Sequence, residues 1–226
     1  VDTVPARRVG EGNDLLGNLR KGNMKTIHDL LKDYDLLKAE QYQERDAFAF
    51  LLRAIREGSF DLSIEAATGY FHGYMTSQLL SHRRQSDYEK RELKAYREKD
   101  VSPVVKAIMN GLYIGFSGLL LLDELSVSRD FSVLWERYKN LFDPVEQEFV
   151  TTCYEHKTDR KSYQGSAEAF LYNSAFVRDS MYRTLRDAFD ESRLDALSSG
   201  RFKRAVDQKK NAEILDTAQE ALLDMQ

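Results

Sequence analysis

Residues 103–122 read PVVKAIMNGLYIGFSGLLLL, a run that is apolar on every side when it is wound into a helix. Ser102 suits an N-cap and Pro103 suits the first helical position, where the missing N–H needs no partner. The uncharged part, Ala107 to Leu122, covers about 16 residues, whereas a helix needs roughly 20 to cross a bilayer. We therefore predict the buried central helix of a soluble bundle, and we do not favour a membrane partner.

The segments on either side of this run place apolar residues at helical spacing. No segment shows the period-two alternation of a strand, and three prolines leave long stretches free of helix breakers. The sequence therefore predicts an all-α fold, a single-domain multi-helix bundle of about eight helices around the central helix near 103–122. The other helices are expected at 24–37, 44–57, 60–84, 131–142, 145–155, 167–189 and 202–222, with 87–100 an exposed helix or connector and 156–164 a surface loop.

One domain over residues 13–226 is expected, because a chain of 226 residues is within what one hydrophobic core can serve. Residues 1–12 mix proline, glycines and charges without an apolar period, which predicts a flexible lead-in. The first residues show no secretory pattern, and Cys153 is the lone cysteine. Nothing in the sequence requires an oxidising compartment, so we expect a cytoplasmic protein.

Glycines occur at two places inside predicted helices. Gly111, Gly115 and Gly118 lie in the central helix, where small residues admit a crossing helix. Gly69 and Gly73 each lower helix stability by roughly 1 kcal/mol relative to alanine. We expect close approach of a neighbouring helix to compensate for this loss, as in the central helix. Both groups predict tight helix–helix contacts.

Two segments resemble the turn between the helices of tetratricopeptide-type repeats. They read EGSFDLSI over residues 57–64 and SGRFKRAV over residues 199–206, and in each the glycine permits the turn while the phenylalanine packs back on the preceding helix. They lie 142 positions apart, from 57 to 199, and no period of about 34 residues links them. An ordinary helix–turn–helix connection is therefore the favoured interpretation of both.

No catalytic or cofactor motif is found. Cys153 and His156 are close in sequence but point in different directions on a helix, so the cysteine is expected to be a buried structural residue. The four histidines include no pair at zinc-ligand spacing, and no glycine-rich phosphate loop is present. We therefore predict no enzyme activity, no metal and no cofactor. A helical enzyme whose polar side chains converge only in three dimensions is the alternative, because a single sequence does not show such convergence.

Positive charge gathers in one segment, which we predict to lie on a helix over 201–210. The net charge of −4 argues against a dedicated binder of polyanions, so a solvated helix face is favoured there over a nucleic-acid site. The five basic residues are Arg201, Lys203, Arg204, Lys209 and Lys210.

The absence of catalytic motifs favours a helical protein–protein interaction module, such as an adaptor, a regulatory subunit or a secreted effector domain, with another protein as partner. Twelve tyrosines agree with partner recognition, because tyrosine is enriched at interfaces. The alternative is a nucleic-acid-associated protein that uses the basic helix 201–210. The oligomeric state is left open.

Overall fold

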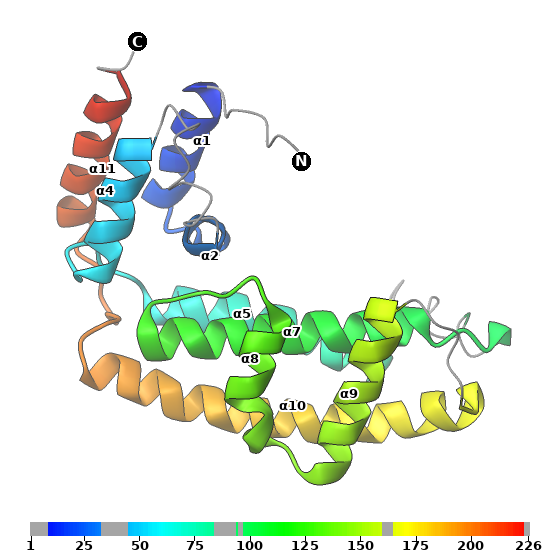
Figure 1. Ribbon diagram of the computed structural model, residues 1–226. Helices are drawn as coiled ribbons and strands as arrows, with labels where there is room; N and C mark the ends of the chain where they lie inside the picture. The colour runs from blue at the N-terminus through cyan, green and yellow to red at the C-terminus, as the bar shows by residue number, and fades with distance from the viewer. Residues whose placement is uncertain (1–8, 33–44, 84–93, 95–96, 160–164, 224–226) are drawn as a thin grey trace. The chain divides into compact units, whose positions relative to one another are not determined.

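The protein is all-α, as predicted. The computed structural model describes residues 9–32, 45–83, 94, 97–159 and 165–223, and within these ranges it contains helices, one isolated β-bridge and no strand (Figure 1). The helices with defined bounds are α1 (Val9–Arg20), α2 (Met24–Lys32), α4 (Arg45–Arg56), α5 (Ile64–Leu79), η1 (Ser81–Arg83), α7 (Ser102–Glu124), α8 (Phe131–Tyr138), η2 (Lys139–Leu141), α9 (Pro144–Asp159), α10 (Ala167–Ser198) and α11 (Gln208–Leu223).

Contacts between Cα atoms divide the chain into two compact units. Unit 1 comprises residues 1–70, 120–129 and 192–226, and unit 2 comprises residues 71–119 and 130–191. The chain passes from one unit to the other within α5, α7 and α10, so each of these helices contributes residues to both. This division into units does not test the prediction of one domain over residues 13–226, which stays a prediction.

Several predicted boundaries are moved by the structure. Helix α1 begins at Val9, so the last residues of the predicted lead-in, 9–12, are helical. Helix α9 continues to Asp159, which makes the first part of the predicted loop 156–164 helical. Helix α10 runs on to Ser198, well past the predicted end at 189. Most of the predicted connector 87–100 and the end of the predicted helix 24–37 lie outside the described residues.

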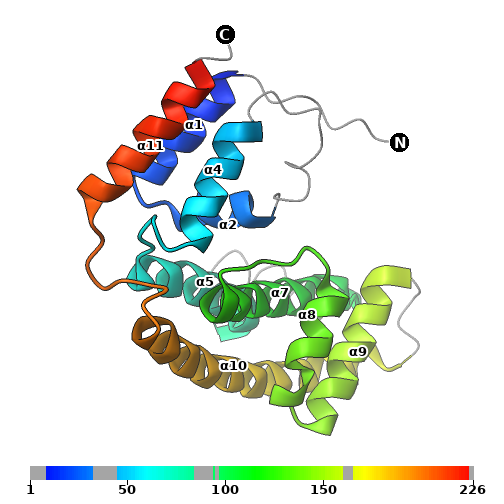
Figure 2. The same cartoon turned by 60° about the vertical axis from the view of Figure 1, so that its left-hand side comes forward.

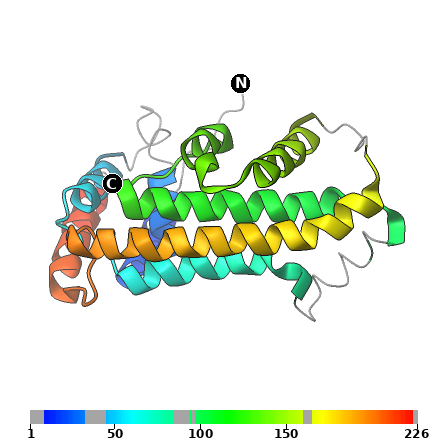
Figure 3. The ribbon, with the colours of Figure 1, turned by 90° about the horizontal axis from the view of Figure 1, so that it is seen from below.

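Helix α7 is a buried core helix. It is long and apolar enough to cross a membrane by length and composition, yet 83% of its most apolar window is buried inside the structure. In unit 2 it runs alongside α5 and α10 (Figures 1 and 3). The apolar character of 103–122 is therefore explained by neighbouring helices of the same chain.

Helices α5 and α10 approach α7 closely at its glycines. A Cβ added at Gly111 would lie 2.7 Å from Leu79 Cγ, and one added at Gly118 would lie 2.7 Å from Phe71 Cβ and also overlap the ring of Phe189. Real Cβ atoms do not pack at such distances. The prediction of close helix contacts along Gly111, Gly115 and Gly118 is confirmed.

The same prediction for Gly69 and Gly73 of α5 is wrong. A Cβ added at either position would meet nothing within 4 Å, and both residues are exposed. They lie on the outer side of α5, whereas Phe71 and Met75 point into the core. These two glycines therefore weaken the helix without helping its packing.

Aromatic side chains of α8 and of Phe142, which follows η2, cover another side of α7. Phe116 of α7 is fully buried, and the rings of Tyr138 and Phe142 lie 5.5 and 6.0 Å from it, centroid to centroid. Asp143 and Glu146 then form a capping box at the start of α9: Asp143 N–H donates to Glu146 Oε2 at 3.1 Å, and Glu146 N–H donates to Asp143 Oδ1 at 2.8 Å. Helices α8 and α9 lie on the same side of α7 (Figures 2 and 3).

Alanine substitutions at two glycines test this packing. Gly118→Ala is expected to lower the free energy of unfolding by about 2–3 kcal/mol, because its Cβ would overlap Phe71 and Phe189. Gly73→Ala is expected to raise it by roughly 0.5–1 kcal/mol, because the site is an open helix interior. Urea unfolding followed by circular dichroism measures both, and equal effects at the two sites would contradict the assigned contacts.

Candidate functional site

The predicted basic helix 201–210 is not one helix. Residues 201–207 form a turn and an extended connection, and α11 begins only at Gln208. The glycine at 200 ends α10 with a positive φ of 75°, and Asp207 caps α11 by accepting from the N–H groups of Lys209 and Lys210. The five basic side chains therefore do not share one helical face.

Three of the five basic residues are tied to unit 1 itself. Arg201 Nε donates to the carbonyl of Leu122 at 3.1 Å, and Lys210 Nζ lies 2.7 Å from Asp61 Oδ1. The backbone N–H and carbonyl of Lys203 form hydrogen bonds with Leu62 and Ile64. Arg204 and Lys209 are exposed. The nucleic-acid hypothesis stays a prediction, but most of its candidate residues hold the fold together.

The two turns that resemble each other in sequence lie side by side. Gly58 and Gly200 both have positive φ, and the residue two positions later, Phe60 or Phe202, bonds back to the preceding helix and is buried. Lys203 N donates to the carbonyl of Leu62 at 2.8 Å, and its own carbonyl accepts from the N–H of Ile64 at 3.1 Å. The similarity reflects two paired helix–turn–helix connections.

An ion pair between Lys210 and Asp61 also joins this region of unit 1. Asp61 exposes 8% of its side chain. Burial acts to raise the pKa of its carboxyl group, but the hydrogen bond from Lys210, the N–H of Asp207 and the charges of Lys210 and Lys203 outweigh it and lower the pKa below the ordinary 3.8. The charged form of Asp61 is therefore stabilised by folding.

Replacing Lys210 tests the role of this pair. Lys210→Met is expected to lower the free energy of unfolding by about 1–3 kcal/mol at pH 7, because it leaves a buried carboxylate without its cation. A carboxyl group with a lowered pKa stabilises the fold above its unfolded pKa and loses that effect as pH falls through the folded pKa. The difference from the parent should therefore shrink below pH 3.8.

Urea unfolding at pH 7 and about pH 3 gives this comparison. Lys209→Met is the matched control, because Lys209 is adjacent and exposed, and it should change the unfolding free energy by less than about 0.5 kcal/mol. A loss of the same size at both pH values would show that the hydrogen bond from Lys210 Nζ to the carbonyl of Gly58 matters rather than the ion pair with Asp61.

Cys153 is a buried thiol, as predicted. Burial raises its pKa to about 12, although the positive charge of Arg178 acts in the opposite direction. His156 points elsewhere and lies 3.3 Å, Nε2 to Oγ, from the exposed Ser102. His156 Nδ1 is buried without a hydrogen-bond partner among the described residues, so no acceptor there holds Nδ1 as the third member of a catalytic triad would.

Thiol chemistry checks the state of Cys153. In the folded protein Ellman's reagent at pH 8 should react with it roughly a thousandfold more slowly than in the unfolded chain, because reaction must wait for unfolding. The same reaction in denaturant supplies the reference rate. Comparable rates in the two states would place the thiol at the surface and reopen the nucleophile hypothesis.

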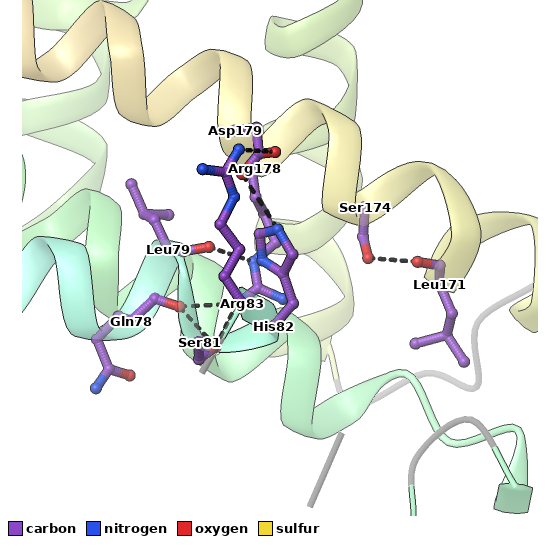
Figure 4. Close-up of polar contacts among 9 residues, drawn as sticks. All are labelled: Gln78, Leu79, Ser81, His82, Arg83, Leu171, Ser174, Arg178 and Asp179. Atoms are coloured by element: carbon purple, nitrogen blue, oxygen red, sulfur yellow. Dashed lines mark hydrogen bonds and ion pairs between the residues drawn. The ribbon is translucent and has the colours of Figure 1, made fainter. Parts of the chain in front are cut away.

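Arg178 is buried among carbonyl groups at the end of α5 (Figure 4). Its Nε donates to Leu79 O at 2.9 Å and its Nη2 donates to Gln78 O at 2.8 Å and to Ser81 Oγ. These oxygens belong to the last turn of α5 and to η1, where a cation and added donors are favourable. Arg178 is therefore a structural cap that fixes α10 against α5.

The described residues offer no metal site, since no group of three or more histidine, cysteine, aspartate or glutamate side chains there could hold an ion. The neighbouring Asp179 is shared by His82 and Arg83, with His82 Nε2 at 3.1 Å (Figure 4). Both the Arg178 cap and this cluster join η1 to α10. Their geometry serves packing within unit 2.

The candidate site is an apolar groove between α9 and α10 in unit 2. It encloses about 730 Å³. The rings of Phe149 and Phe170, which both line it, stack with their centroids 5.0 Å apart and their planes inclined by 16°. The residues that line it are Val145, Glu148, Phe149 and Thr152 of α9, and Phe170, Tyr172, Asn173, Ala175, Phe176 and Val177 of α10.

Large apolar side chains are left exposed along this groove. Tyr172, Phe176 and Val145 expose 80%, 74% and 68% of their surfaces. Sequence reasoning missed the groove because it followed only the buried stripe of α10. The signal was nonetheless present, since Tyr172 and Phe176 are four residues apart and lie off the stripe that contains Leu171 and Met181.

No family model, curated protein or solved structure shows a significant match to this chain. The groove therefore has to be interpreted from its own residues.

Proposed function

We propose that this protein is a helical interaction module that binds an amphipathic helix of a partner protein in the groove between α9 and α10. The exposure of Tyr172, Phe176 and Val145 around one hollow supports this most directly. Scattered exposed apolar residues are common, but a cluster around a concave surface is typical of a binding site.

The shape and chemistry of the groove suit a helix. Helix α9 crosses α10 steeply (Figure 1), both helices line the hollow, and a third helix can place residues at i, i+3 or i+4, and i+7 in it. Burying one large apolar side chain is worth about 1.5–3 kcal/mol. Tyr172 and Phe176 could therefore anchor a partner, and aromatic residues are the commonest anchors at interfaces.

The groove is also held rigidly. On its inner side α9 buries Val150 and Cys153, and α10 buries Leu171 and Arg178. The hydrogen bonds of Arg178 to the end of α5 fix α10 further. A preformed groove loses little conformational entropy when a ligand binds, which favours affinity.

Selection of helical peptides tests the proposal. A displayed library of helical peptides is selected against the full chain, and bound sequences should carry apolar residues at i, i+3 or i+4, and i+7. Phe176→Ser should weaken their affinity about tenfold or more, because it removes an anchor from the groove.

Val133→Ser is the matched control, because Val133 is 56% exposed and lies on α8, away from the groove lining. It should leave affinity unchanged, and circular dichroism should show that both variants fold. Peptides that bind the Phe176→Ser variant as well as the parent would contradict the proposed site. An adaptor, a regulatory subunit and an effector domain would all use such a groove, and a cytoplasmic location remains part of the proposal.

A further inference from the structure

The α9 edge of the groove is acidic. Glu148 lines the hollow, and Glu155 follows seven residues later, so the two lie on one face about 10 Å apart with Thr152 between them. Both side chains are exposed. Neither has a lysine or arginine three or four residues away in α9, and neither forms an ion pair in the part of the chain that the structure describes.

The α10 edge of the groove is different in character. It presents the aromatic rings of Tyr172 and Phe176 and the neutral amide of Asn173. Arg183 is the next cation along this face, seven residues beyond Phe176, and it does not line the hollow. Among the lining residues Glu148 alone is charged. The groove therefore has an apolar edge and an acidic edge.

From this asymmetry we infer the chemistry of the partner: the groove binds an amphipathic helix that carries two basic residues seven positions apart, facing Glu148 and Glu155, beside an apolar stripe that packs on Tyr172 and Phe176. The inference rests on the proposed function and specifies its ligand. A spacing of seven residues matches the two glutamates when the partner helix lies along α9, because both helices rise by about 1.5 Å per residue. Since α9 crosses α10, a helix in this direction passes across α10 at Tyr172 and Phe176.

The size of the charge effect follows from the exposure of both glutamates. An exposed ion pair strengthens an interaction only about two- to fivefold, and salt screens it. Two pairs should therefore favour a basic over an acidic peptide by about tenfold at low ionic strength. The apolar contacts provide affinity, and the acidic edge provides selectivity and orientation.

Two synthetic peptides of about 18 residues test the inference. Both carry leucine and phenylalanine at i, i+4, i+7 and i+11. One has lysine at two positions seven residues apart along one edge, and the other has glutamate at the same two positions. Fluorescence anisotropy of the labelled peptides measures their affinity for the full chain in low and high salt. The lysine peptide should bind about tenfold more tightly, with the preference reduced in high salt.

Charge-reversal variants connect the preference to the groove. The double variant Glu148→Lys with Glu155→Lys should reverse the order of the two peptides. Glu191→Lys with Glu213→Lys is the control, because both glutamates are exposed, lie outside the groove lining and change the net charge equally. This control should keep the parent's preference, and a loss of preference there would overturn the inference by attributing it to net charge.

The remaining outcomes separate the inference from the proposed function. Equal binding of both peptides, abolished by Phe176→Ser, would overturn the charge inference and leave the groove as a helix-binding site. Binding of neither peptide, or binding that is insensitive to Phe176→Ser, would count against the proposed function and the inference together. Reversal by the groove variant alone would support both.

Discussion

The close approach of α5 and α10 to the glycine side of α7 is the constraint on which unit 2 depends. At Gly111 and Gly118 the space that a methyl group would fill is occupied by Leu79 and Phe71 of α5, and Phe189 of α10 also reaches Gly118. The missing side chains let the helices approach closely, which increases the dispersion attraction between them. The position of α10, and with it one wall of the groove, therefore depends on the missing side chains of α7.

Helix α10 uses its faces for different purposes. One face is buried through residues such as Leu171 and Leu185, and Arg178 extends from it to cap the end of α5. Another face carries Tyr172 and Phe176 and remains exposed. A helix held on one side by a buried, hydrogen-bonded guanidinium has little freedom to turn its aromatic residues inward. Their exposure is thus imposed by the fold and persists unless a ligand covers them.

The helical fold could be predicted from the sequence, because periodicity and caps are local. The apolar run predicted to be helical at 103–122 is found as helix α7. What local patterns omit is which face meets a neighbour. Gly73 and Gly118 are the same residue inside a helix, yet one faces open space and the other faces Phe71. Which side of a helix contacts a neighbour is a property of the tertiary structure, and a single sequence does not record it.

The candidate site shows the same limit in a sharper form. The positive charge of residues 201–210 made them the candidate binding residues, but the sequence could not show that Lys210 lies against Asp61, 149 positions away. A cation that is already paired and partly desolvated gains little from a further partner, because its interaction is satisfied inside the fold. Glu148 and Tyr172 are modest signals in the sequence, yet in the structure they keep unsatisfied binding capacity. The side chains most available to a partner are therefore the exposed ones that the fold leaves without an ion pair or a buried contact.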